Sequence, residues 1–124
     1  MSNECIPLYR PGRDVTAVTT TAVVGKTFVL WSAALTTGLP SVATATAAGK
    51  VSGVAAYSAA SGARVAVIRG AGLILPVTAG GTIAALAEVE VGATGRAVTI
   101  ASGVAVGRAL SAGTSGNECI IELY

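Results

Sequence analysis

Residues 63–69 read Ala-Arg-Val-Ala-Val-Ile-Arg and carry the pattern on which the fold prediction rests. In an extended chain, Val65, Val67 and Arg69 face one side while Arg64 and Ala66 face the other. This alternation is typical of a strand with one buried face. Turn signals flank the segment, Ser61-Gly62 before it and Gly70-Ala71-Gly72 after it. We therefore predict a short β-strand between two turns.

Similar segments recur along the rest of the chain. Apolar residues do not recur at helical spacing, glycine interrupts nearly every stretch, and Val, Thr and Ile dominate. The Ala-rich stretches 32–35 and 83–87 allow one short helix at most. The predicted strands are residues 15–21, 27–32, 50–57, 63–69, 73–78, 88–91, 96–101, 103–110 and 118–123.

Many short strands joined by glycine turns indicate an all-β fold. We predict a small antiparallel barrel or sandwich of short strands. The 124 residues are the usual length of one domain, so residues 15–124 are expected to form a single β domain. Residues 1–14 are expected to form an extended N-terminal arm.

Two prolines, Pro7 and Pro11, distinguish this arm, because each biases the preceding residue toward an extended conformation. The apolar side chains between them need a partner surface. Two interpretations remain open: the arm caps its own domain, or it docks on a neighbouring subunit or larger assembly. In the second case the contact residues are Ile6, Pro7, Leu8, Tyr9, Arg10 and Arg13.

The composition excludes several classes of function. The chain has no histidine, so serine-type triads, histidine-based zinc sites and histidine proton shuttles are absent. We predict no catalytic, metal-binding or cofactor-binding residue, and no enzyme activity. The net charge of +2 is small and scattered, so we expect no nucleic-acid partner. Charged residues make up only 11% of the chain, which predicts a surface largely covered by other proteins.

A membrane location is not expected either. The long uncharged stretches 27–49 and 70–87 are interrupted by proline and glycine, and neither holds about 20 mainly apolar residues in a row. The first residues lack the basic and apolar segments of a secretory signal. In a chain made in the cytoplasm, Cys5 and Cys119 are expected to stay reduced and to pack as small hydrophobic residues. A disulfide that forms late between them is the alternative.

Two internal sequence repeats are visible. The sequence Asn-Glu-Cys-Ile occurs at 3–6 and at 117–120, and residues 49–56 resemble 95–98 followed by 102–106. A duplicated hairpin and chance similarity both explain the second repeat. Elsewhere, Glu88 and Glu90 fall on one face of a strand, which we expect to be solvated or to pair with arginines between subunits. Most of the five aromatic residues are expected to be structural, with Tyr124 as a candidate interface residue.

Four segments taken together resemble a known family. They read CIPLYRPG (5–12), DVTAVTTTAVVGKTFV (14–29), GKVSGVAAYSAASGARVAVIRGAGLILPVTAGGTIAALAEVEVGATGRAV (49–98) and GVAVGRALSAG (103–113), before a terminal strand that ends in Leu-Tyr. This order resembles the small capsid decoration proteins of tailed phages, notably those that infect actinobacteria. The resemblance covers nearly the whole chain.

The resemblance implies a structural, non-enzymatic role without a cofactor. Such proteins are small β-rich homotrimers, assembled in the host cytoplasm, that bind the major capsid protein on the outside of the head and stabilise its lattice. Few bulky side chains and low charge agree with that role, since the chain gains little from its own core and more from association. The alternatives are a head fibre or adhesion module on the virion surface, and a lipoyl- or biotinyl-type carrier modified at Lys50.

Overall fold

The computed structural model describes residues 14–35 and 38–124, and these residues form strands and turns without a helix. The all-β prediction is therefore confirmed. The Ala-rich stretch 83–87 is a turn in which Leu86 has a φ of 71°. Ten strands occur in the described residues: β1 (Asp14–Thr19), β2 (Phe28–Ala33), β3 (Ser41–Thr44), β4 (Gly53–Ala55), β5 (Arg64–Ile68), β6 (Ile74–Thr78), β7 (Glu88–Val91), β8 (Ala97–Thr99), β9 (Gly107–Ala109) and β10 (Glu118–Leu123).

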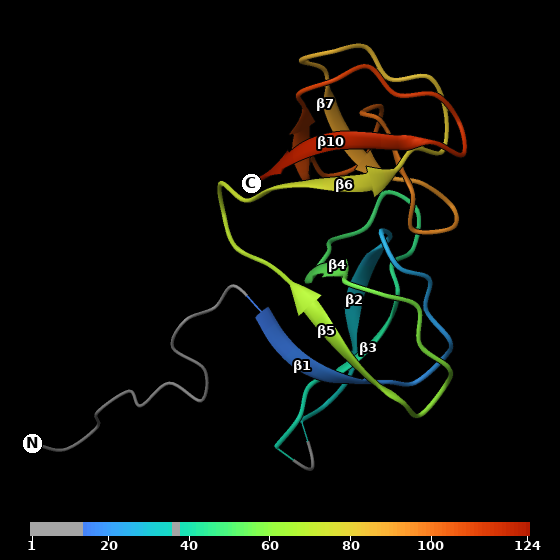
Figure 1. The fold of residues 1–124 in the computed structure, drawn as a ribbon, viewed down its shortest axis with the longest axis vertical. Helices are drawn as coiled ribbons and strands as arrows, with labels where there is room; N and C mark the ends of the chain where they lie inside the picture. Colours follow the sequence, from blue (N-terminus) through green and yellow to red (C-terminus); the bar gives the residue numbers. More distant parts are fainter. Residues whose placement is uncertain (1–13, 36–37) are drawn as a thin grey trace, which may run out of the picture.

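The strands form two lobes stacked along the long axis of the molecule (Figure 1). Strands β1 to β5 close into a barrel in the order β1-β3-β2-β4-β5, and we call this the N-lobe. Strands β6 to β10 form a sheet in the order β6-β10-β9-β7-β8, and we call this the C-lobe. The pairings are antiparallel except between β1 and β3, which run parallel.

The two lobes are copies of one topology. Read from β8, the C-lobe order β8-β7-β9-β10-β6 matches the N-lobe order β3-β2-β4-β5-β1. The registers match as well, since Val29 pairs with Gly53 in the N-lobe and Val89 with Gly107 in the C-lobe. The parallel β1–β3 pairing has its counterpart in a parallel bridge between Ala79 and Ala97. The structure thus contains a duplication, although in a different register from the repeat of 49–56 in 95–106.

Small side chains fill the N-lobe barrel. Its core includes Val29, Val42, Val65 and Val67, each with no exposed surface. Val65 and Val67 are the alternate residues of β5 that were predicted to face inward. Branched side chains suit this role because they pack well across the pleated surface of a sheet.

A second core fills the C-lobe and continues into the junction between the lobes. Phe28 and Val54 of the N-lobe belong to the same cluster as Val77, Val89 and Ile121 of the C-lobe. Backbone hydrogen bonds cross the junction from the amide of Phe28 to the carbonyl of Gly95 (2.7 Å), from Thr78 to Lys26 (2.8 Å) and from Ala48 to Val91 (2.8 Å). The lobes are therefore joined by packing and by main-chain bonds.

One edge of β6 lacks a partner strand. Thr78 directs its amide away from β10, toward the carbonyl of Lys26. Amides two residues apart point to the same side of a strand, and Pro76, which has no amide hydrogen, occupies that side of β6. Within the described residues, no strand pairs with this edge over 74–77. The proline fits an edge strand and not a central one.

Most predicted strands are found, with ends that shift by a few residues. Strand β3 was missed, because Ser-Val-Ala-Thr offers small residues and only one valine to face a core. Only three residues of each of the predicted strands 50–57 and 103–110 form a strand, as β4 and β9. The backbone bends before and after each of them. The single domain over 15–124 and the arm over 1–14 remain predictions, and the arm lies outside the described residues except for Asp14.

Candidate functional site

The outer side of the C-lobe carries bulky apolar residues that face solvent. Ile74 and Ile120 are 59% and 36% exposed, and Leu86 and Leu110 are 66% and 40% exposed. Ile120 pairs with Pro76 across the sheet, and the amide of Leu110 donates to the carbonyl of Ile120 at 2.7 Å. We call Ile74, Pro76, Leu86, Leu110 and Ile120 the apolar face.

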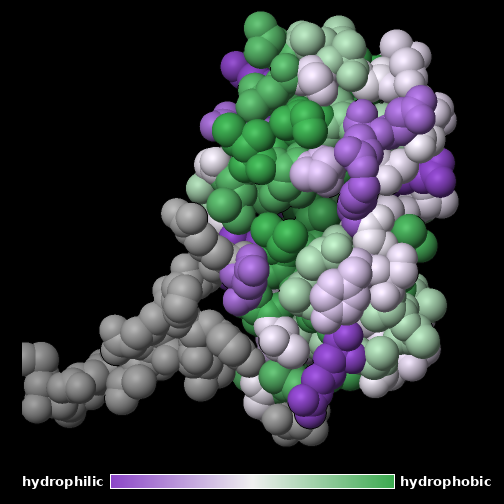
Figure 2. Space-filling view, viewed as in Figure 1, coloured by the Kyte–Doolittle hydropathy of each residue, from purple (hydrophilic) through white to green (hydrophobic). Residues whose placement is uncertain are grey.

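The N-lobe provides an internal comparison for this face. Lys26 is the counterpart of Leu86: their amides donate to Ala55 and Ala109, and both have positive φ values, 63° and 71°. The other counterparts are Asp14 for Ile74, Thr16 for Pro76, Ala56 for Leu110 and Ala66 for Ile120. Because the same topology forms with polar or small residues there, the fold does not require the apolar face. Figure 2 shows hydrophobic residues gathered over the β6 and β10 region of the upper lobe.

A groove runs along the junction between the lobes. Three hollows of about 160, 420 and 240 Å³ all have Val51 in their lining. The N-lobe contributes Trp31, Lys50 and Val51, and the C-lobe contributes Val104, Val106 and Tyr124. We call these six residues the waist groove.

Two aromatic side chains border the waist groove and each has a charged partner. The guanidinium carbon of Arg69 lies 5.8 Å from the centre of the Trp31 ring, and Arg69 Nε donates to the carbonyl of Ser52 at 3.2 Å. The hydroxyl of Tyr124 donates to Glu88 Oε2 at 2.6 Å, which raises the pKa of Tyr124. Trp31 and Tyr124 remain 44% and 52% exposed, so both are available to a partner.

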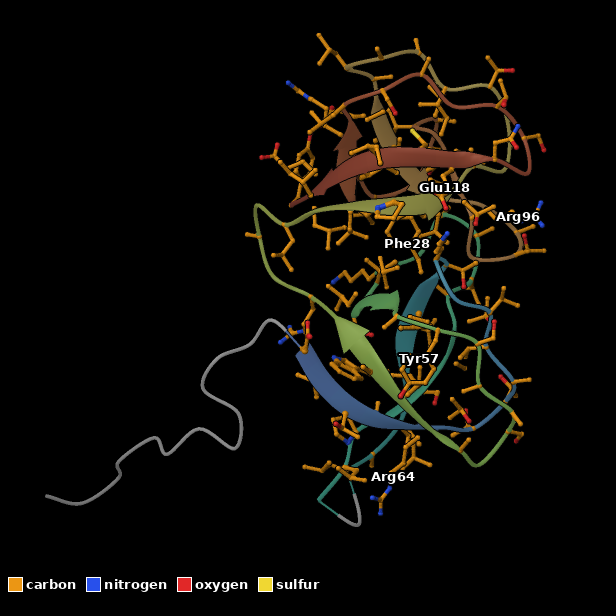
Figure 3. The ribbon with its side chains drawn as sticks, viewed as in Figure 1. Phe28, Tyr57, Arg64, Arg96 and Glu118 are labelled. Atoms are coloured by element: carbon orange, nitrogen blue, oxygen red, sulfur yellow. The ribbon has the colours of Figure 1, made fainter. Side chains whose placement is uncertain are left out.

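The expectation that most aromatic residues are structural was wrong for the described ones. Phe28 is fully buried at the junction of the lobes, where Figure 3 labels it, whereas Trp31, Tyr57 and Tyr124 are about half exposed. The hydrophobic core of the barrel consists of valine and alanine, so none of these rings belongs to it. Tyr124 at a groove agrees with its prediction as an interface residue.

Charge is divided unequally between the lobes. The N-lobe range 14–68 holds Asp14, Lys26, Lys50 and Arg64, whereas the C-lobe range 73–124 holds four glutamates against Arg96 and Arg108. Lys26 and Glu118 form an ion pair across the junction, and both side chains are about half exposed. Arg64 lies at the far end of the N-lobe in Figure 3, away from this pair.

The glutamates of β7 differ from the prediction of a solvated pair. Glu88 is partly exposed, lies opposite Arg108 in the strand register and accepts the hydroxyl of Tyr124. Its pairing with an arginine of another subunit stays a prediction. Glu90 is only 6% exposed, because Ala48 of the N-lobe and Gly103 lie against its carboxylate. Its Oε1 accepts the amide of Ala101 at 3.0 Å, and Oε2 has no hydrogen-bond partner among the described residues.

The predicted contact residues of the arm, Ile6 to Arg10 and Arg13, lie outside the described residues, as does Cys5. Cys119 is buried, its thiol donates to the carbonyl of Ser111 at 3.2 Å, and burial raises its pKa. The disulfide therefore remains a prediction. Sequence reasoning missed the apolar face and the waist groove, because both depend on how distant segments meet.

Within residues 14–35 and 38–124, no three His, Cys, Asp or Glu side chains are grouped as metal ligands would be. The same part of the chain contains no helix able to cross a bilayer.

Comparison with solved structures shows a likeness in fold. No protein family and no curated protein sequence matches the chain. Among solved structures, it is similar to the head fiber gp8.5 N base of bacteriophage phi29, with a TM-score of 0.77 and 18% identity. The alignment covers 90% of this chain and 92% of that one, so both lobes share the fold.

Proposed function

We propose that the protein is a structural component of a phage virion that binds the outside of the capsid and stabilises the head lattice, as a decoration protein does. The apolar face is the observation that carries this proposal. It exposes four large aliphatic side chains at positions where the equivalent lobe has polar or small residues. Contiguous exposed apolar surface of this kind marks an interaction site.

The fold likeness supports the location. A protein from a phage head has the same two-lobed topology over nearly its whole length. The major capsid protein is then the partner, and repetition of one weak contact across a symmetric lattice produces tight overall binding. Association as a homotrimer and additional contacts by arm residues 6–10 and 13 are parts of the same proposal.

Binding to emptied phage heads tests it. The double variant Ile74→Asp/Leu86→Lys replaces two residues of the apolar face by those at the equivalent N-lobe positions, so the fold should tolerate it. We expect wild-type protein to co-sediment with heads, and the variant to bind at least about tenfold more weakly. Val24→Lys changes an apolar residue that is 62% exposed outside this face and should bind normally. Wild-type protein that ignores heads would overturn the proposal.

A head fibre base or adhesion module is the second candidate. The half-exposed Trp31, Tyr57 and Tyr124 favour it, because aromatic side chains are frequent anchors in recognition sites. In this case the protein would bind host cells as well as heads. Tyr57→Ala should then abolish cell binding without reducing head occupancy, and the absence of any cell binding by wild-type protein would exclude this role.

A further inference from the structure

We propose that the waist groove of one copy receives the N-terminal segment 5–10 of a neighbouring copy. The inference rests on the proposed function, since it names the contact that links neighbouring subunits on the head.

The groove has the character of a peptide-binding surface. Val51, Val104 and Val106 form an apolar floor, and Trp31 and Tyr124 stand at its borders. Val104 is 47% exposed, so the floor is accessible from solvent. Grooves lined by aromatic residues bind extended segments that contain proline, because such segments lose little conformational entropy on docking.

The segment 5–10 has matching chemistry. It reads Cys-Ile-Pro-Leu-Tyr-Arg, so a proline lies among three large apolar side chains. The two other prolines at 40 and 76 lie within the described fold, and Pro76 belongs to β6. The arm is therefore the part of the chain that offers an apolar, proline-containing peptide.

The start of β1 indicates why a second copy is the acceptor. Asp14 lies opposite Ile68, and the next residue, Arg69, already lines the groove of the same chain. Five Cα steps separate Asp14 from Tyr9, which is about 17 Å when extended. Pro11 opposes a reversal at Arg10, because the residue before proline avoids helical conformations. An extended arm that starts beside one groove is thus long enough to enter the groove of a neighbouring copy.

Trp31 permits a direct test, because it is the only tryptophan of the chain and borders the groove. Protein lacking residues 2–13 is titrated with a synthetic peptide of residues 2–13 while the emission of Trp31 is recorded. We expect a saturable blue shift. A peptide with serine at 6, 8 and 9 should give none. Val104→Lys in the protein should raise Kd at least about tenfold, whereas Val24→Lys should leave it unchanged.

Light scattering on the full chain then identifies the acceptor. We expect an oligomer whose mass falls toward one chain in Val104→Lys but not in Val24→Lys. Absence of any Trp31 response to the peptide overturns the inference, even where the full chain still decorates heads. If the truncated protein binds the peptide but the full chain stays monomeric, the arm occupies the groove of its own chain. This outcome also overturns the inference. Peptide binding and association by a chain that ignores heads would overturn the proposed function but not this contact.

Discussion

Gly53 and Gly107 hold the same position in the two lobes, and each lies against the neighbouring strand. A Cβ on Gly53 would be 2.6 Å from the carbonyl oxygen of Ile68, and a Cβ on Gly107 would be 2.6 Å from that of Glu122. Real Cβ atoms do not approach backbone oxygens so closely. Both lobes therefore require a residue without a side chain where β4 pairs with β5 and where β9 pairs with β10.

Substitution of either glycine should destabilise the protein. We expect Gly53→Ala and Gly107→Ala each to lower the free energy of unfolding by about 1–3 kcal/mol, because the backbone must shift to admit the methyl group. Urea unfolding followed by Trp31 emission measures the loss. Gly81→Ala is the matched control, since a Cβ there meets nothing within 4 Å. Equal effects at all three sites would contradict the close contact.

The ion pair between Lys26 and Glu118 should contribute little to stability. Both side chains are about half exposed, so solvent and salt screen their attraction. We expect Glu118→Gln to cost less than about 1 kcal/mol, and less still at high salt. A double-mutant cycle with Lys26→Met isolates the pair. A coupling well above that limit would mean that the pair, and not the core around Phe28, joins the lobes.

Removal of the charge on Glu90 should stabilise the protein or leave it unchanged. Among the residues that the structure describes, only Oε1 of the buried carboxylate has a hydrogen-bond partner, and burial of a charge that is not fully paired is unfavourable. Glu90→Gln keeps an acceptor for Ala101, whereas Glu90→Ala removes it and should cost about 1–3 kcal/mol. Chemical unfolding of both variants tests the ranking, and a Gln variant less stable than the Ala variant would refute it.

Cys119 should make the stability fall in alkaline solution. Burial raises the pKa of its thiol above 9.0, so near and above that pH the unfolded chain loses the proton while the folded chain keeps it. The free energy of unfolding then falls as the pH rises from the ordinary pKa of a thiol to the higher pKa of Cys119 in the folded protein. Thermal unfolding between neutral and alkaline pH should show a shallower decline for Cys119→Ala. An identical decline would show that this thiol does not contribute.

The same burial should protect Cys119 from thiol reagents. In Cys5→Ala, which leaves Cys119 as the only cysteine, we expect labelling to be slow in buffer and rapid in urea. Intact mass of the unreduced wild-type protein tests the alternative of a disulfide, which would appear as the loss of two hydrogens. Rapid labelling in buffer would contradict the buried position.

The all-β fold could be predicted because segments like β5, in which Val65 and Val67 recur at the period of a strand with one buried face, repeat along the chain between glycine turns. The duplication was harder to recognise. Its counterparts differ in side chain, such as Lys26 and Leu86 or Phe28 and Glu88, so only a few positions such as Gly53 and Gly107 are shared. The repeat visible in the sequence aligned Gly53 with Gly103 instead, since serine, glycine, valine and alanine recur throughout the chain.

The surfaces could not be predicted for a related reason. Leu86 and Leu110 are apolar residues that a sequence pattern assigns to a core, and only the second lobe shows that the fold tolerates polar or small residues there. Glu90 alternates with Val89 and Val91 as a solvent-facing residue would, but Ala48 of the other lobe covers it. Such contacts come from segments far apart in the chain, which local periodicity does not report.

In the proposed role on a phage head, where copies stand at high local density, Pro76 has a consequence. Many copies crowded on one shell would present many open sheet borders to one another, and an open border is a template for fibre growth. Because the proline lacks a donor in the middle of that border, a neighbouring chain that extended the sheet there would lose a ladder hydrogen bond. The residue thus opposes polymerisation through the main chain and leaves packing through side chains unaffected.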